Sequence, residues 1–122
     1  MTPKKKLKVI VVEDDKFLLK AIVYKFNEAK FYTKTTTTAE EGLEVLKTWT
    51  PDVIVLDILL PGIGGYAFLR KVKNNPKLKN IPIIISSNLD KDPSLDFGYD
   101  DYIVKSDLDL DELVTRIRSH IK

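Results

Sequence analysis

The residues of this chain best suited to chemistry are three carboxylates that follow two apolar runs. Glu13 and Asp14 follow the run Leu7–Val12, and Asp57 follows the run Val53–Leu56. Short unbroken runs of Val, Ile and Leu are typical of strands buried on both faces of a sheet. In open parallel sheets, ligands bind just outside the carboxyl ends of such strands. We therefore take Asp57 as the candidate working residue, with the other two carboxylates beside it.

Two further runs end on residues that complement these acids. Ile81–Ser86 is followed by Ser87, and Tyr102–Val104 is followed by Lys105. Three carboxylates close together repel one another, so proton uptake or a cation must relieve them. An all-oxygen cluster without His or Cys suits a hard ion such as Mg²⁺. A metal ion and a lysine facing one carboxylate, with a hydroxyl nearby, are suited to hold a phosphoryl group.

Each of these side chains also has a purely structural explanation. Glu13 and Asp14 could only cap a helix, and Lys105 could be an exposed strand end. Ser87 could be a solvated loop residue, in which case Ser86 would supply the hydroxyl near the carboxylates. An aromatic residue in a strand is more often core than functional. The joint occurrence of suitable residues at four strand ends favours the functional interpretation.

Apolar residues at helical spacing separate the strands. The expected helices cover Leu18–Ala29 with Asp15 as N-cap, Ala39–Thr48, Tyr66–Asn75 and Asp109–Ile121. The segment Phe31–Thr37 is rich in β-branched and aromatic residues but less apolar, which predicts a strand at the sheet edge. Strands that alternate with helices predict right-handed crossovers and a parallel sheet covered on both faces. The sequence thus predicts an α/β fold.

Composition narrows the class of protein. The chain has 122 residues, 43% hydrophobic and 31% charged, which predicts one domain over residues 1–122 with a flexible basic N-terminus at 1–6. A net charge of +2 does not indicate a nucleic-acid partner. The absence of cysteine excludes thiol catalysis and disulfides. No apolar segment of membrane-spanning length and no signal peptide are visible, so we expect a cytoplasmic protein without a membrane partner.

Four segments together resemble the receiver domain of two-component response regulators. They are Val11–Asp15, Leu56–Gly62, Pro82–Asn88 and Asp101–Lys105. The resemblance covers essentially the whole chain, and the order and spacing of the segments are highly specific. It implies a flavodoxin-like, doubly wound, five-stranded parallel sheet of strand order 2-1-3-4-5.

The resemblance also implies roles for particular residues. Asp57 is then the phospho-acceptor, whose carboxylate attacks phosphorus. The expected Mg²⁺ ligands are Asp14, Asp57 and the backbone carbonyl of Leu59, with Glu13 acting through water. Lys105 would pair with a phosphoryl oxygen. The switch residues would be the hydroxyl of Ser87 and the aromatic ring of Tyr102. Such a domain assists its own phosphorylation and dephosphorylation but is not otherwise an enzyme.

The chain departs from the family pattern in ways that bear on signalling. Leu89–Gly98 is about four residues short, roughly one helical turn, and is rich in Asp with a Pro and a Gly. We therefore expect the fourth helix to be shortened or missing. Gly64 stands where an acidic or amide residue is frequent, and Ser106 stands where proline is common. Leu59 and Leu89 occupy positions that tune loss of the phosphoryl group, which favours a long-lived phosphorylated form.

The expected partners are a histidine kinase or phosphotransfer protein and a downstream protein that contacts the last strand and last helix. We expect a monomer or weak dimer, and either a stand-alone receiver or a piece of a longer protein. The alternative function is a pseudo-receiver, or structural scaffold, that is never phosphorylated. A phosphohydrolase of the haloacid dehalogenase type would need an aspartate at position 59, where Leu59 stands. His120 is expected to be solvated, with no relay or metal role.

Overall fold

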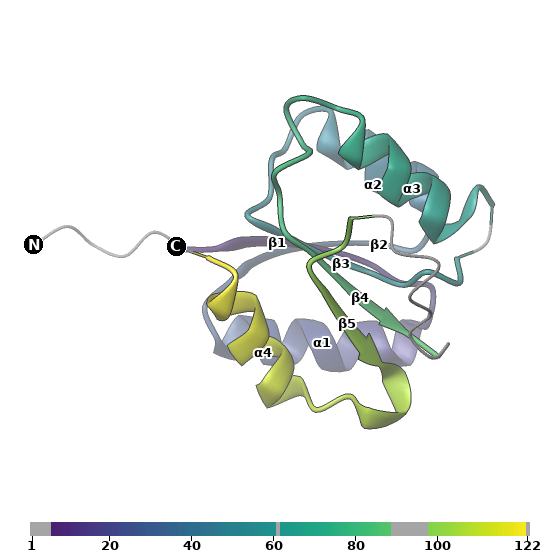
Figure 1. Cartoon of the computed structure of the whole chain (residues 1–122). Coiled ribbons are helices and arrows are strands. Elements are labelled where there is room, and N and C mark those ends of the chain that lie inside the picture. Colours follow the sequence, from purple (N-terminus) through teal and green to yellow (C-terminus); the bar gives the residue numbers. More distant parts are fainter. Residues whose placement is uncertain (1–5, 61, 89–97, 122) are drawn as a thin grey trace, which may run out of the picture.

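A five-stranded parallel sheet lies between two pairs of helices in the computed structural model, which describes residues 6–60, 62–88 and 98–121 (Figure 1). The strands are β1 Lys8–Val12, β2 Tyr32–Thr36, β3 Val53–Leu56, β4 Ile83–Ser87 and β5 Asp101–Val104. The helices are α1 Lys16–Glu28, α2 Ala39–Leu46, α3 Gly64–Lys73 and α4 Leu110–Ser119, with a short 3₁₀ helix, η2, at Lys105–Asp107.

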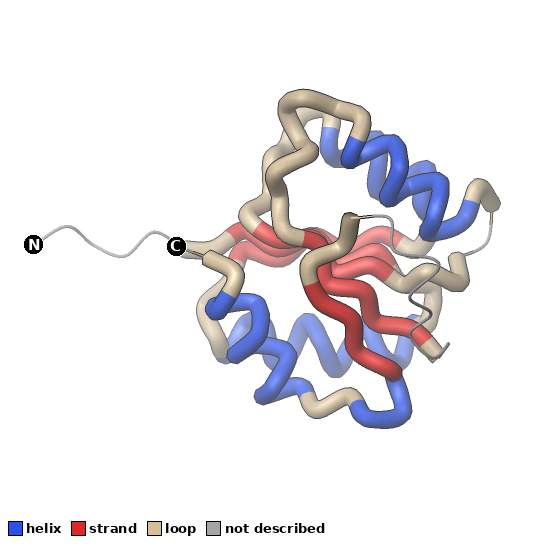
Figure 2. The backbone as a smooth tube through the Cα atoms, viewed as in Figure 1, coloured by secondary structure: helices blue, strands red, loops and turns tan. Residues whose placement is uncertain are grey.

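The strand order is β2-β1-β3-β4-β5, which confirms the predicted flavodoxin-like order. The polar strand β2 lies at one edge, as its composition predicted, and β5 lies at the other (Figure 2). The register pairs Val12 with Leu56 and Val104 with Ser87. Because these pairs close their strands, the residues that follow them leave the sheet at the same edge.

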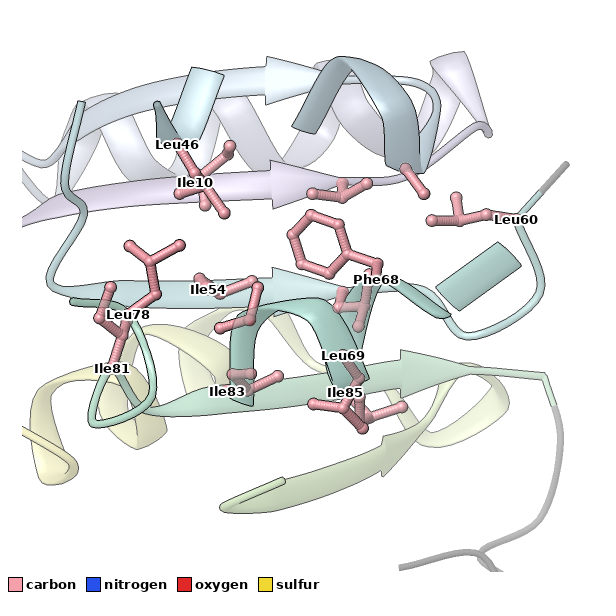
Figure 3. Close-up of a cluster of buried hydrophobic side chains, with 14 of the residues drawn as sticks. Ile10, Leu46, Ile54, Leu60, Phe68, Leu69, Leu78, Ile81, Ile83 and Ile85 are labelled. Atoms are coloured by element: carbon pink, nitrogen blue, oxygen red, sulfur yellow. The ribbon is translucent and has the colours of Figure 1, made fainter. Parts of the chain in front are cut away.

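The core has two halves, one on each face of the sheet. Because successive strand residues point to opposite faces, Val9 and Val11 pack toward α1 and α4, whereas Ile10 and Val12 pack toward α2 and α3. In the second half, Phe68 of α3 lies over the sheet, among the side chains of several strands (Figure 3). A sheet packed on both sides holds the ends of its strands in place.

Side-chain caps set the starts of three helices. Asp15 accepts hydrogen bonds from the backbone N–H groups of Phe17 and Leu18 at 3.0 and 3.1 Å, which confirms it as the N-cap of α1. Thr38 and Asp109 cap α2 and α4 in the same way. None of the helices in the described part of the chain is long and apolar enough to cross a membrane.

The closing helix of the chain is α4. The expected shortened fourth helix falls on Leu89–Gly98, of which all but Gly98 lies outside the described residues. That expectation therefore stays a prediction.

Candidate functional site

Three carboxylates meet where β1 and β3 end. Oxygen atoms of Glu13, Asp14 and Asp57 all lie within 4.8 Å of one another. Glu13 and Asp57 are buried, at 3% and 4% exposure, whereas Asp14 is exposed. The register explains this meeting, because the N–H of Asp57 donates to the carbonyl of Val12 at 2.9 Å. The result is a concentrated negative charge with one member open to solvent.

Lys105 supplies the opposing charge from the residue after β5. Its Nζ lies 2.6 Å from Oε1 of Glu13 and 3.1 Å from Oδ2 of Asp57. The Lys105 side chain is only 12% exposed. One ammonium group therefore bridges the two buried carboxylates and leaves Asp14 outside the bridge in the described structure.

Burial and pairing shift the ionisation of this site. Burial raises the pKa of Glu13, the hydrogen bond from Lys105 opposes the rise without cancelling it, and the charge of Asp57 adds to it. Burial acts to lower the pKa of Lys105, but its hydrogen bonds to Glu13 and Asp57 outweigh that effect and raise the pKa above the usual value of a lysine. Lys105 is therefore charged at neutral pH, and the carboxylates gain from any further cation.

The chain after β3 holds the carboxylate of Asp57 in a fixed direction. The backbone N–H of Leu59 donates to Oδ1 of Asp57 at 2.9 Å, while Oδ2 accepts from Lys105. Among the described residues, each oxygen of this carboxylate thus has one donor. Because a carboxylate oxygen accepts more than one hydrogen bond or metal contact, both oxygens keep capacity for a ligand.

Gly65, in the first turn of α3, lies against the backbone that carries Asp57. A Cβ at this position would lie 2.5 Å from Cα of Ile58 and 2.6 Å from the carbonyl oxygen of Asp57. Its N–H also donates to the carbonyl of Ile58 at 3.1 Å. Only glycine lets the start of α3 approach the backbone beside Asp57 this closely. The signal in the sequence was the Gly64–Gly65 pair.

Gly64 has a different reason to be glycine. Its φ is +82°, in the left-handed region, and a Cβ would have no neighbour within 4 Å. Asn and Asp also tolerate this region better than other residues with side chains. This backbone angle favours glycine at position 64 in this chain.

The end of β4 separates the two candidate hydroxyls. Ile85 pairs with Tyr102 in the sheet and packs on the α2–α3 side, so Ser87 shares that face with Tyr102 and Ser86 lies on the other. Ser87 is fully buried. Burial raises the pKa of Tyr102, and a side-chain hydrogen bond with Ser87 opposes the rise. The structure therefore associates Ser87, rather than Ser86, with Tyr102.

His120 does not fit its expectation of a solvated side chain. Its Nε2 lies 3.2 Å from Oδ2 of Asp101, and the histidine side chain is 25% exposed. Nη1 of Arg116 donates to the other oxygen of the same carboxylate at 2.9 Å. The prediction was wrong because the sequence does not show that β5 begins beside the last turn of α4. Nothing at this pair adds to the chemistry of Asp57.

Comparisons with known proteins give the family. Residues 9–118 match the sequence model of the response regulator receiver domain. The response regulator ArlR of Staphylococcus saprophyticus is 35% identical over 119 residues, which is 94% of this chain and 52% of that protein. The chain thus spans about half the length of the curated relatives it matches.

Solved structures agree with this family. The receiver domain of the Francisella response regulator 1452 is 33% identical with a TM-score of 0.85, and the match covers 94% of this chain and 96% of that one. The BeF3-activated DrrB receiver domain is 29% identical with a TM-score of 0.81, covering 95% and 97%. A putative response regulator from Chloroflexus aurantiacus is 27% identical with a TM-score of 0.86, covering 95% and 98%. The chain belongs to the family of response regulator receiver domains.

Proposed function

We propose that this receiver domain, spanning residues 1–122, accepts a phosphoryl group on Asp57 from a histidine kinase, a phosphotransfer protein or a small phospho-donor. The observation that carries the proposal is the bridge from Lys105 to Asp57 and Glu13 beside the exposed Asp14. A lysine that only closed a strand would not be buried between two carboxylates. The similarity to a receiver domain activated by BeF3 also supports the proposal.

In the transfer step, Oδ2 or Oδ1 of Asp57 forms a new bond to phosphorus. The bond between phosphorus and the donor breaks, and its electron pair stays on the donor. The donor atom is a histidine nitrogen in a kinase or phosphotransfer protein, or an oxygen in an acyl phosphate. The product is an acyl phosphate on Asp57. Lys105 releases Asp57 and turns its ammonium toward a phosphoryl oxygen, where it stabilises the charge that develops in the transition state.

The residues present fit a magnesium ion. The carboxylate oxygens of Glu13, Asp14 and Asp57 converge within 4.8 Å, without His or Cys, and hard oxygen ligands are those Mg²⁺ prefers. We propose that Asp14, Asp57 and the carbonyl of Leu59 hold the ion directly and that Glu13 does so through water. When bound, the ion supplies positive charge that draws phosphoryl oxygens toward Asp57.

Phosphorylation would bias the pair formed by Ser87 and Tyr102. The hydroxyl of Ser87 would leave Tyr102 to bond the phosphoryl group, and the released Tyr102 ring would change its contacts on the face of β5. The downstream protein partner would read this change at β5 and α4. Arg116 of α4 and His120, the residue that follows this helix, hold Asp101 at the start of β5, so the two elements would respond together.

Two exposed aromatic residues suggest where a protein donor docks. Phe17 and Tyr24 on α1 are 88% and 70% exposed, and Phe17 lies three residues after Asp14. Aromatic residues are enriched at protein interfaces.

The proposal places the chain in the cytoplasm, where ATP-dependent kinases supply the phosphoryl group. The expected monomer or weak dimer stays a prediction.

The phosphorylated form is expected to persist. Leu59, half exposed beside Asp57, would hinder an attacking water molecule because its side chain can neither orient nor activate one. Leu89 was predicted to act with it but lies outside the described residues. Hydrolysis within seconds at neutral pH would contradict this expectation.

Intact-mass spectrometry after incubation with acetyl phosphate, with and without Mg²⁺, tests the proposal. We expect one phosphoryl adduct that requires Mg²⁺ and is absent from Asp57→Asn. Asp52→Asn is the matched control, because Asp52 lies at the other end of β3 and should leave the adduct unchanged. No adduct on folded protein at high donor concentration would favour a receiver fold that is not phosphorylated.

A further inference from the structure

A hollow lies at the end of the sheet opposite Asp57. It has a volume of about 330 Å³ and is lined by Lys8, Tyr32, Thr33, Lys34 and Trp49. Lys8 and Tyr32 are the first residues of β1 and β2 and pair in register. Asp57 follows the carboxyl end of β3, whereas Lys8 and Tyr32 begin their strands, so the hollow and Asp57 lie at opposite ends of the parallel strands. The hollow is therefore independent of the site described above.

Two aromatic side chains form walls of the hollow. Trp49 follows α2, packs against the core with part of its surface and is half-buried. Tyr32 is 54% exposed. A Trp and a Tyr that both line one hollow, each partly open to solvent, offer flat surfaces on which a planar ring can stack.

An ammonium group lies over one face of each ring. Nζ of Lys34 lies 5.1 Å from the centre of the Trp49 ring, and Nζ of Lys6 lies 4.3 Å from that of Tyr32. Across residues 6–60, 62–88 and 98–121, none of the ion pairs includes Lys6, Lys8 or Lys34. These positive charges are available to an anion.

We propose that the hollow binds a small molecule in which a flat aromatic ring carries an anionic group. The ring would stack against Trp49 and Tyr32, and the anion would pair with the ammonium groups of Lys8 and Lys34. A mononucleotide and an aromatic carboxylate share this chemistry, and they differ in whether phosphate or carboxylate meets the lysines.

A lysine in an edge strand has a second known use, since its charge discourages pairing with another chain. That use needs no aromatic walls and no hollow. It predicts no saturable binding of a small anion, so the same measurement decides between the two explanations.

Trp49 is the chain's single tryptophan, so fluorescence excited selectively at tryptophan, rather than at the five tyrosines, reports on this hollow. We would titrate the full chain, without Mg²⁺ or phospho-donor, with AMP and with benzoate. Adenosine controls for a ring without an anion, while inorganic phosphate and acetate control for an anion without a ring. We expect a saturable change with AMP or benzoate, at a Kd of about 1 mM or tighter. We expect no such change with the controls. Tighter binding of AMP would identify phosphate as the preferred anion, and tighter binding of benzoate would identify carboxylate.

Lys34→Met provides the variant test, with Lys79→Met as the matched control for lost charge. Both lysines are exposed, so both variants should fold, which urea unfolding checks. We expect Lys34→Met to weaken binding about fivefold, the effect of an exposed ion pair. Lys79→Met should leave it unchanged.

Three outcomes would overturn the proposal. They are no saturation by about 10 mM in either arm, binding of adenosine or phosphate as tight as that of AMP, and equal weakening by the two lysine variants.

Discussion

Nζ of Lys105 lies 3.1 Å from Oδ2 of Asp57, although 48 positions separate the two residues in the sequence. The contact exists because β3, β4 and β5 are consecutive neighbours in one parallel sheet. Lys105 also reaches Glu13 after β1, so one ammonium group joins the ends of three strands. The pairing of Lys105 with Glu13 and Asp57 therefore affects both the stability of the fold and the reactivity of Asp57.

Lys105→Met should destabilise the metal-free protein. Glu13 and Asp57 would keep their burial but lose their counter-charge, which we expect to lower the free energy of unfolding by about 2 kcal/mol. The value lies below that for a fully buried pair because 12% of the lysine side chain is exposed. Urea unfolding at neutral pH measures it. Lys79→Met should stay within about 0.5 kcal/mol of the parent, and an equal loss in both variants would contradict the bridge.

Glu13→Gln should have opposite effects on stability and on metal affinity. Burial raises the pKa of Glu13, so its ionised form is disfavoured in the folded state. In the parent protein, the N–H of Asp15 donates to Oε2 of Glu13 at 3.0 Å. The glutamine side chain of the variant removes the charge and can still accept this hydrogen bond. We expect a more stable metal-free protein and a Mg²⁺ affinity about tenfold weaker.

Urea unfolding and calorimetric titration with Mg²⁺ measure these two effects of Glu13→Gln. A variant that is less stable without metal would show that the contact of Glu13 with Lys105 outweighs its burial. Glu44→Gln is the matched control, because Glu44 lies exposed on α2, away from the carboxylate cluster. It should leave the Mg²⁺ affinity unchanged.

Gly65→Ala and Gly64→Ala should differ although the residues are neighbours. The new Cβ at position 65 would meet backbone atoms of Ile58 and Asp57 at 2.5 and 2.6 Å. We expect a loss of about 3 kcal/mol and slower phosphorylation, because the backbone beside Asp57 must move. Alanine at 64 meets nothing and carries only the strain of φ +82°, about 1 kcal/mol. Thermal or urea unfolding ranks the two, and the reverse order would contradict the close approach.

Asp101→Asn should loosen the contact between β5 and α4. The carboxylate accepts from Nη1 of Arg116 and contacts Nε2 of His120, and both contacts weaken without its charge. We expect a loss of about 1 kcal/mol in the free energy of unfolding. Glu112→Gln is the comparison, since Glu112 holds the same Arg116 as an exposed i,i+4 pair worth about 0.3 kcal/mol. Urea unfolding measures both variants, and an equal loss in the free energy of unfolding would contradict a role for Asp101 in joining β5 to α4.

Much of the fold could be predicted because its signals are local. Apolar runs such as Val53–Leu56 end on polar residues, and the alternation of strands with helices limits the topology to a few right-handed forms. The strand order came from the resemblance, and the structure confirms it. The carboxyl-end rule for parallel sheets also predicted that Glu13, Asp14, Asp57 and Lys105 would gather. Their roles in phosphoryl transfer stay predictions.

By itself, then, the sequence determined the elements, the side of the sheet to which each strand end points, and the kinds of groups that gather there. Backbone propensity and apolar periodicity act over a few residues, so they can be read without a model of the whole. The tertiary structure alone decided the contact of His120 with Asp101, the need for glycine at 65, and the hollow beside Trp49. Each of these depends on contacts between separate elements, and such contacts exist only once the helices pack on the sheet.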